Sequence, residues 1–325
     1  MAERSIRWGM TVPFPGITLD EHHDLISLIG NLGYDDIWSS EANGADAFTI
    51  LGAASVLAPR VRLATGIVNT FTRPVGVLAQ TSVAMAELSK GNFCLGLGSS
   101  TKVMVESWHG ISWEKPLAKM RKTILELREL WSGGRLDGGF KLERLPKAPI
   151  PIAIGCLGSK MIALAGEVAD IALITSTPVS AIGKIREAIQ DAQSQAGRSA
   201  GSVELAARIW CIPGPEKEAL EQARGWLSQL LGAPPYIEFY ASHGWGDLLK
   251  PAQDAWAARD KALAAELIPE SFLREIVVFG EPEEMKTQLR AFAVAGVDTL
   301  ILAPLCGAEE LRELLIALSP SEHQN

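Results

Sequence analysis

Short apolar segments of strand length alternate with longer segments of helical periodicity along nearly the whole chain. The expected strands cover residues 6–12, 35–40, 61–68, 92–98, 152–155, 170–175, 203–212 and 297–304. The expected helices cover residues 20–32, 46–57, 74–88, 117–131, 160–166, 179–195 and 309–318. Because strands that alternate with helices form parallel sheets, and about eight such units suit a closed sheet, the pattern predicts an α/β fold, a (β/α)8 TIM barrel in a single domain of residues 1–325.

Two stretches do not fit the repeating unit. Residues 132–149 are rich in Gly and Pro, which predicts a hairpin or loop insertion after the fourth helix. Residues 213–271 contain two or three helical pieces, near 216–231, 236–249 and 252–265, which Pro234, Pro235 and Pro251 are expected to separate. We therefore expect a helical insertion between strands seven and eight. An open dinucleotide-binding sheet is disfavoured, because no G-x-G-x-x-G motif follows the first strand.

The βα unit over residues 61–88 has the most distinctive turn of the chain. Its strand is interrupted at Gly66, and the polar turn that follows contains Asn69, Thr70, Thr72 and Arg73. Pro74 then suits the first turn of a helix, where a missing N–H costs nothing. Binding residues tend to lie on such turns, although the pattern alone fits an ordinary βα connection equally well.

Composition narrows the function classes. The net charge of −8 disfavours general nucleic-acid binding, which needs a basic face, and it requires that local donors hold any anionic cofactor. The cysteines lie far apart with no C-x-x-C pair, so they predict small buried side chains rather than a disulfide framework or a metal site. These are Cys94, Cys156, Cys211 and Cys306.

The apolar runs are short. The first ten residues lack an apolar stretch of signal-peptide length, and the run 300–305 is far shorter than the roughly 20 residues of a membrane span. We therefore expect a cytoplasmic protein with no membrane partner.

Two motifs resemble one family. TGIVNTFTRPVGVLAQ (65–80) resembles the turn after the third strand of the luciferase-like monooxygenase superfamily, in particular its branch that uses the deazaflavin coenzyme F420. VVFGEPEEMKTQLRAFAVAGVDTLIL (277–302) resembles the closing signature of that superfamily. The resemblance implies a non-prolyl cis peptide, here Gly66–Ile67, which forms a bulge behind the middle ring of the cofactor.

In a barrel of this kind the active site lies at the C-terminal ends of the strands. The resemblance and this geometry imply a set of cofactor-binding residues. Of these, Gly155, Gly158 and Ser159 are expected to hold the cofactor phosphate at a helix start and Lys160 to add charge, although a glycine-bearing helix cap is the simpler interpretation. The full set is Thr11, Glu41, Thr65, Gly66, Ile67, Val68, Asn69, Gly96, Gly98, Ser99, Gly155, Leu157, Gly158, Ser159, Lys160 and Thr175.

The expected catalytic residues are Glu41 and His109. Much of the family has S-D-H where this chain has Ser40, Glu41 and Ala42, so the acid is present and the imidazole is absent. Some relatives also carry a catalytic acid where this chain has Thr101. His109 lies in a loop expected to overhang the mouth, and an exposed loop histidine is the simpler interpretation.

Other polar residues have alternative interpretations. Arg73 is expected either to contact the anionic tail of a deazaflavin or to cap its turn. Arg208 and Trp210 are expected as wall residues of the cavity, with Trp210 also compatible with the core. The histidines of the first helix, His22 and His23, are expected on its outer side, and His243 is a weaker candidate for the cavity.

The resemblance implies an F420-dependent oxidoreductase that transfers a hydride between the deazaflavin and a small organic substrate. Two alternatives stay open, an FMN-dependent monooxygenase and a non-catalytic flavin- or deazaflavin-binding barrel. Family members are often dimers, so a homodimer is expected. Aromatic residues of the insertion indicate a moderately hydrophobic substrate, unless they serve as core or dimer contacts. They are Trp226, Tyr236, Phe239, Tyr240 and Trp245.

Overall fold

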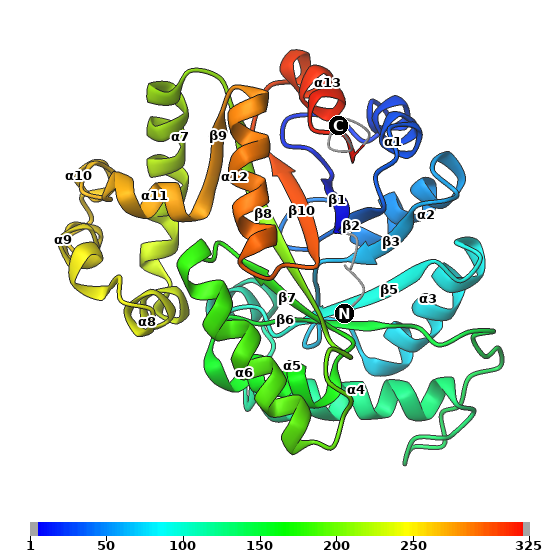
Figure 1. The fold of residues 1–325 in the computed structure, drawn as a ribbon. Coiled ribbons are helices and arrows are strands. Elements are labelled where there is room, and N and C mark those ends of the chain that lie inside the picture. Colours follow the sequence, from blue (N-terminus) through cyan, green and yellow to red (C-terminus); the bar gives the residue numbers. More distant parts are fainter. Residues whose placement is uncertain (1–5, 321–325) are drawn as a thin grey trace.

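Eight parallel strands close into a barrel in the computed structural model, which describes residues 6–320 (Figure 1). The ring runs β10–β1–β2–β3–β5–β6–β7–β8, and β8 pairs with β10 to close it. Its strands are β1 (Arg7–Val12), β2 (Asp36–Ser39), β3 (Arg62–Thr65), β5 (Phe93–Gly98), β6 (Ile152–Gly155), β7 (Ile171–Thr175), β8 (Glu204–Pro213) and β10 (Thr299–Pro304). The predicted TIM barrel is therefore confirmed.

Two short strands extend this ring. β4 (Val68–Asn69) continues the line of β3 after a two-residue bulge and pairs with β5. β9 (Val277–Gly280) pairs with the second half of β8, outside the closed ring. The expected third strand, 61–68, is thus split at Gly66, where the sequence pattern is interrupted.

Helices surround the barrel because each buries one apolar side on the strands. In α4 (Pro116–Trp131), Met120, Ile124 and Leu127 are fully buried, at the spacing of one helical face. The other covering helices are α1 (His22–Asn31), α2 (Ala47–Leu57), α3 (Val75–Leu88), α5 (Ser159–Val168), α6 (Ile182–Gln195), α12 (Pro282–Val294) and α13 (Ala308–Ala317), with the short η1 (Val103–Trp108) and η2 (Val179–Ala181) in the connections.

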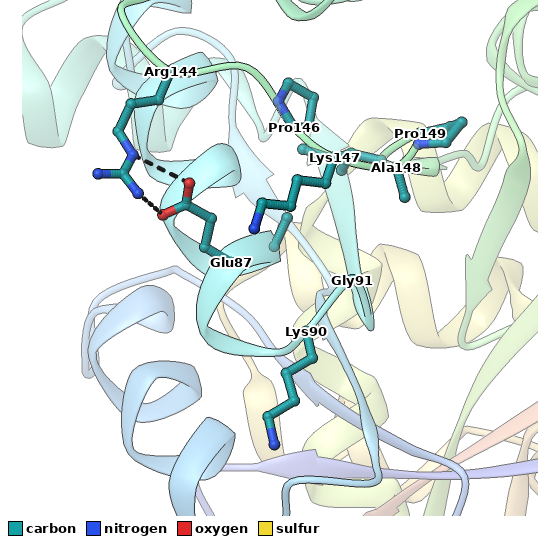
Figure 2. Close-up of a pocket in the computed structure, with 10 residues that line it drawn as sticks. Glu87, Lys90, Gly91, Arg144, Pro146, Lys147, Ala148 and Pro149 are labelled. Atoms are coloured by element: carbon teal, nitrogen blue, oxygen red, sulfur yellow. Dashed lines mark hydrogen bonds and ion pairs between the residues drawn. The ribbon is translucent and has the colours of Figure 1, made fainter.

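The first insertion is a loop, as expected. Between α4 and β6 the chain forms no helix or strand, and it folds back against α3. There Arg144 pairs with Glu87, with the closest atoms 2.7 Å apart (Figure 2). A hollow of about 440 Å³ beside this pair is lined by Lys90 and Lys147, near the start of β6 and so on the N-terminal side of the barrel.

The second insertion is helical and projects from one side of the barrel (Figure 1). It consists of α7 (Glu216–Ser228), η3 (Gln229–Gly232), α8 (Pro234–Ser242), α9 (Gly246–Ala257), α10 (Lys261–Glu266) and α11 (Glu270–Ile276). The expected single helix 236–249 is wrong, because Gly244 takes a φ of +90° and separates α8 from α9.

The expected break at Pro251 is also wrong. Pro251 lies inside α9, where it removes one helical hydrogen bond. Leu249, Ala252 and Ala255 form a buried face around it, and this packing holds the helix through the proline.

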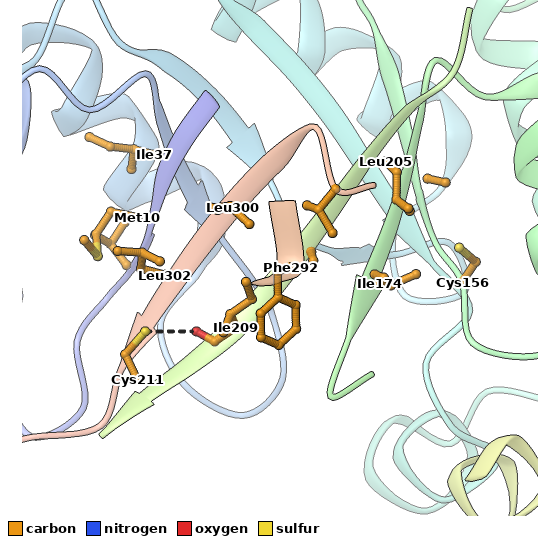
Figure 3. Packing of buried hydrophobic residues seen from close by; sticks show 14 of the residues in the cluster. Met10, Ile37, Cys156, Ile174, Leu205, Ile209, Cys211, Phe292, Leu300 and Leu302 are labelled. Carbon is orange, nitrogen blue, oxygen red and sulfur yellow. Dashed lines mark hydrogen bonds between the residues drawn. The ribbon is translucent and has the colours of Figure 1, made fainter. Parts of the chain in front are cut away.

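Alternation along the strands produces two cores. One set of side chains points outward and packs under the helices, as Met10, Ile37 and Leu302 do in Figure 3. The other set fills the barrel and consists of Trp38, Ala64, Cys94, Ala153, Ile171, Leu173, Ala206 and Ile301, with Ile67 against it. The small members of this interior set leave room for the Trp38 ring.

Candidate active site

A cavity of about 430 Å³ opens where the turns after β2, β3 and β5 meet. It lies at the C-terminal end of the barrel, where active sites of this fold are found. Its lining brings together Glu41, Asn69 and His109, three of the predicted site residues that are far apart in sequence. The structure adds Arg73 and Ser100 to this lining.

The Glu41 carboxylate is held by Arg73. The Arg73 Nε atom donates to Glu41 Oε2 at 2.9 Å, and its guanidinium also pairs with Asp46, the residue that caps α2 by accepting from the Thr49 N–H. The hydrogen bond to Glu41 raises the pKa of Arg73. Arg73 therefore ties its turn to the start of α2, in line with the second of its two interpretations.

The peptide bond between Gly66 and Ile67 is cis, as the resemblance implied. The bulge is anchored on β2 at both sides, since the Gly66 N–H donates to the Ser39 carbonyl at 2.6 Å and the Ile67 carbonyl accepts from the Glu41 N–H at 3.0 Å. Thr65 joins it to β5 through its hydroxyl, which contacts both backbone groups of Gly96. The bulge is thus part of the barrel wall.

Three of the predicted glycines make room for this bulge. A Cβ atom at Gly96 would stand 1.7 Å from the Thr65 carbonyl oxygen. One at Gly98 would stand 2.4 Å from Ile67 Cδ1, and one at Gly155 would stand 3.1 Å from Ile67 Cγ2. The absence of side chains at these positions lets Ile67 lie inside the mouth.

The helix start after β6 faces a second hollow, of about 380 Å³. Gly158 and Ser159 begin α5 on one side, Lys184 of α6 lies on another, and His243 follows α8. Helix N-termini favour anions and Lys184 adds to that preference, whereas the Glu238 carboxylate in the same lining opposes it. Lys184 carried no signal in the sequence, and Lys160 is not part of this lining.

Buried polar atoms without a hydrogen-bond partner gather in the barrel. Among residues 6–320 they are Thr11 Oγ1, Trp38 Nε1, Ser39 Oγ, Thr175 Oγ1 and Arg208 Nε, together with Gln253 Nε2 in α9. Buried polar groups are nearly always hydrogen-bonded, so such a cluster needs an explanation. Thr11 lies in register with Trp38, and Arg208 lies in register with both Thr175 and Ile301. Because Trp38 and Ile301 belong to the interior cluster, Thr11, Thr175 and Arg208 lie on the interior side of the mouth.

The remaining candidates differ in outcome. Ser99 uses its carbonyl to accept from Trp113 Nε1 at 2.9 Å, which anchors the loop that carries His109. The expectation that His22 lies on the outer side of its helix is wrong. This side chain is fully buried, and its Nε2 accepts from the Phe14 N–H at 2.8 Å, so it supports the loop after β1. His23 is exposed, as expected, and His243 lines the hollow beside α5.

The insertion seals the far side of the mouth with aromatic side chains. Trp210 packs against Trp226 at 4.3 Å between ring centroids and donates to Ser176 Oγ at 3.2 Å. Tyr240 is buried and donates to the Ser176 carbonyl at 3.0 Å. These rings therefore join α7 and α8 to the ends of β7 and β8, and Tyr240 serves as core.

Residues 6–320 contain no cluster of three or more His, Cys, Asp or Glu side chains arranged to hold a metal ion. No helix in the same range is both long and apolar enough to cross a bilayer.

Comparisons with known proteins identify the family to which this chain is similar. The sequence model of a family described as luciferase-like monooxygenase matches residues 6–299. A Mycobacterium tuberculosis protein, provisionally named a coenzyme F420-dependent oxidoreductase, is 25% identical over 96% of this chain and 99% of its own. The 5,10-methylenetetrahydromethanopterin reductase of Methanolobus tindarius is 25% identical over 83% of this chain and 85% of its own.

A solved structure shares the fold. The coenzyme F420-dependent tetrahydromethanopterin reductase from Methanopyrus kandleri superposes with a TM-score of 0.79, covering 99% of this chain and 100% of that one. Its sequence is 19% identical, so the likeness concerns the fold alone.

Proposed function

Because this chain belongs to the luciferase-like monooxygenase family, we propose that it is a coenzyme F420-dependent oxidoreductase that transfers a hydride between the deazaflavin and a small organic substrate. The observation that carries the proposal is the mouth itself. Ile67 projects there from a bulge packed against glycines, beside buried hydroxyl groups that have no hydrogen-bond partner among residues 6–320. Such a wall suits a flat ring with polar edges.

The residues present fit a phosphate-bearing ring cofactor. Ile67 would support one face of the ring, and the Thr11 and Thr175 hydroxyls are available to its polar edge. The start of α5 with Gly158 and Ser159, aided by Lys184, would bind the phosphate. The bound deazaflavin supplies the hydride chemistry, while the protein orients the reactants and limits access of water.

The two candidate catalytic residues take different roles in this proposal. The Glu41 carboxylate is engaged with Arg73 and positions the turn after β3. The His109 imidazole lines the cavity and makes no hydrogen bond to another residue of the range 6–320. We therefore propose that His109 exchanges the proton that accompanies hydride transfer. It would take the role of the family histidine, whose position is occupied by Ala42 in this chain.

Cofactor titration tests the proposal. The purified protein is titrated with F420 and, separately, with FMN, and the absorbance and fluorescence of each cofactor are followed. We expect tight binding of F420 and weaker binding of FMN. Binding of neither would refute the enzyme assignment, and preference for FMN would favour an FMN-dependent monooxygenase. Bound F420 without turnover of alcohols, imines or enones would favour a non-catalytic barrel.

Two lysine variants refine the phosphate assignment. Lys184→Gln should weaken F420 binding, because it removes a cation from the hollow at α5. Lys160→Gln is the matched control, since Lys160 lies next to Ser159 in sequence but outside that lining. Equal effects of the two changes would place the phosphate elsewhere.

We also propose a homodimer formed through α2 and α3. α2 contains no charged residue, and Val56 on its surface is 75% exposed. On α3, Val77 and Leu88 add exposed apolar surface. Light scattering coupled to size exclusion should give twice the mass of 34.9 kDa, and Val56→Lys should shift it to the monomer. A monomeric wild-type protein would refute this.

A further inference from the structure

Arg208 lies on the interior side of the barrel mouth and is half-buried as a whole. Its Nε atom is buried and has no hydrogen-bond partner, and no carboxylate among residues 6–320 forms an ion pair with it. Burial lowers the pKa of its guanidinium to about 10, so it still carries a positive charge at neutral pH. A buried charge is costly unless something pairs with it. Residues 6–320 supply no such partner.

Aromatic side chains hold this guanidinium in place. Its central carbon lies 4.3 Å from the centroid of the Trp210 ring, and Trp210 is in turn packed on Trp226 and bonded to Ser176. Tyr236 is near enough for the Arg208 charge to lower its pKa, although burial is stronger and raises it overall. The Tyr236 hydroxyl makes no hydrogen bond to another residue of the described range. Arg208 and Tyr236 thus lie near each other, and each has a polar group with no hydrogen-bond partner among residues 6–320.

The position of Arg208 in the barrel indicates which bound molecule it contacts. β8 stands four strands from β3 in either direction, so Arg208 and the Ile67 bulge lie on opposite walls. Ala206 of β8 and Ile301, the register neighbour of Arg208 on β10, belong to the interior cluster, so Arg208 also faces inward. A ring supported by Ile67 turns its other face toward β8. The group that meets Arg208 therefore belongs to the molecule that binds on that open face.

We propose that this molecule, the substrate, carries a carboxylate that binds the Arg208 guanidinium and the Tyr236 hydroxyl. The planar fork of an arginine matches a carboxylate with two parallel hydrogen bonds, and stacking on Trp210 leaves the N–H edges free for it. The inference rests on the proposed function for the identity of the ring on the opposite wall. It adds the substrate class, a small organic acid with an apolar body that suits the aromatic wall.

Benzoate and benzamide are suitable probes because they share a shape and differ in charge. Their binding to F420-saturated protein is measured by calorimetry and by the quenching of tryptophan fluorescence. Benzoate should bind at least tenfold more tightly than benzamide. Arg208→Gln should weaken benzoate binding at least tenfold and change benzamide binding less than twofold, whereas Arg208→Lys should restore part of the loss. Arg121→Gln, on the outer surface where Arg121 pairs with Glu167, is the control and should change neither.

Three results would overturn the inference. These are absence of benzoate binding, equal binding of the two probes, and an unchanged benzoate affinity in Arg208→Gln. Competition between benzoate and F420, with Arg208→Gln weakening both alike, would instead assign Arg208 to the acidic tail of the cofactor and also refute the inference. Failure of F420 itself to bind is recorded in the separate cofactor titration. Benzoate binding that depends on Arg208 in the absence of F420 would then contradict the cofactor assignment and leave the anion site established.

Discussion

The two ends of the barrel treat buried polar groups in opposite ways. At the N-terminal end, the fully buried Asp36 accepts from Arg7 and from two nitrogens of Arg62, and Arg62 also pairs with Glu204 at 3.1 Å. Thr299 donates to Glu204 and completes the network. At the C-terminal end, Thr11, Thr175 and Arg208 have buried polar atoms with no hydrogen-bond partner in the described part of the chain. The buried polar groups of the N-terminal end are thus paired with one another, whereas those of the C-terminal end are available to a bound molecule.

Two interior arginines show the difference most directly. Burial opposes the charge of both. At Arg62 the carboxylates of Asp36 and Glu204 outweigh burial and raise the pKa above its usual value. At Arg208 burial prevails and lowers the pKa, and the opposing effect of Tyr236 is smaller. We therefore expect removal of Arg62 to destabilise the fold, and we expect Arg208 to destabilise it unless the proposed ligand is bound.

The largest effect is expected at the N-terminal end. Arg62→Met should lower the free energy of unfolding by about 3–5 kcal/mol, because it leaves buried carboxylates undercompensated. Urea unfolding followed by circular dichroism measures this. Arg7→Met is the matched control and should cost less, since the Arg7 side chain is 36% exposed and Asp36 keeps both bonds to Arg62. A loss below about 1 kcal/mol for Arg62→Met would show that the network does not stabilise the barrel.

A smaller effect is expected at the bulge. Gly98→Ala should cost about 1–3 kcal/mol through overpacking, since the new Cβ atom meets Ile67, and it should lower the affinity for F420 by displacing the side chain that supports the ring. Gly44→Ala, in the lining of the cavity that contains Glu41 and with open space around the new atom, should change neither quantity much. Normal F420 affinity in Gly98→Ala would separate Ile67 from cofactor binding.

At Arg208 a substitution should affect the free energy of unfolding differently from the substitution at Arg62. Arg208→Met should leave the free energy of unfolding unchanged or raise it by up to about 1 kcal/mol, because it removes an uncompensated charge and keeps an unbranched apolar side chain. The same urea experiment compares it with Arg62→Met. A loss of more than about 2 kcal/mol would mean that Arg208 has a structural role.

The smallest effect concerns pH. Burial would raise the pKa of Glu204, but Arg62 and Thr299 outweigh it and lower that pKa below its usual value. Glu204 therefore adds stability above the pKa of an unfolded glutamate, about 4.3, and this contribution is lost as the pH falls through the lower folded value. Between pH 7 and 3.5, the melting temperature of the wild type should fall more steeply than that of Glu204→Gln. Parallel curves for the two proteins would contradict this account.

The sequence by itself determined the barrel and the place of its mouth. Strand and helix periodicity reflect which side of each element is buried, and this is a local property that all eight units repeat. The position of the bulge could be predicted for the same reason, because the residues that interrupt the third strand, Gly66 and the motif around it, are local in the sequence. Glu41, Asn69 and His109 could be predicted to lie near one another because they follow strands whose ends meet at one edge, and all three line one cavity.

Only the tertiary structure decided how the polar side chains are paired. Arg73 takes up the Glu41 carboxylate across 32 residues, and Lys184 reaches the start of α5 from a different helix. His22 is buried by the loop that folds over it, and Pro251 is held within a helix by the packing around it. Arg62 and Arg208 lie on strands of similar pattern, yet Arg62 has two acidic partners and Arg208 has none within residues 6–320. That difference arises because ion pairs form between groups brought together by the closure of the barrel, and no local pattern records which neighbours closure will provide.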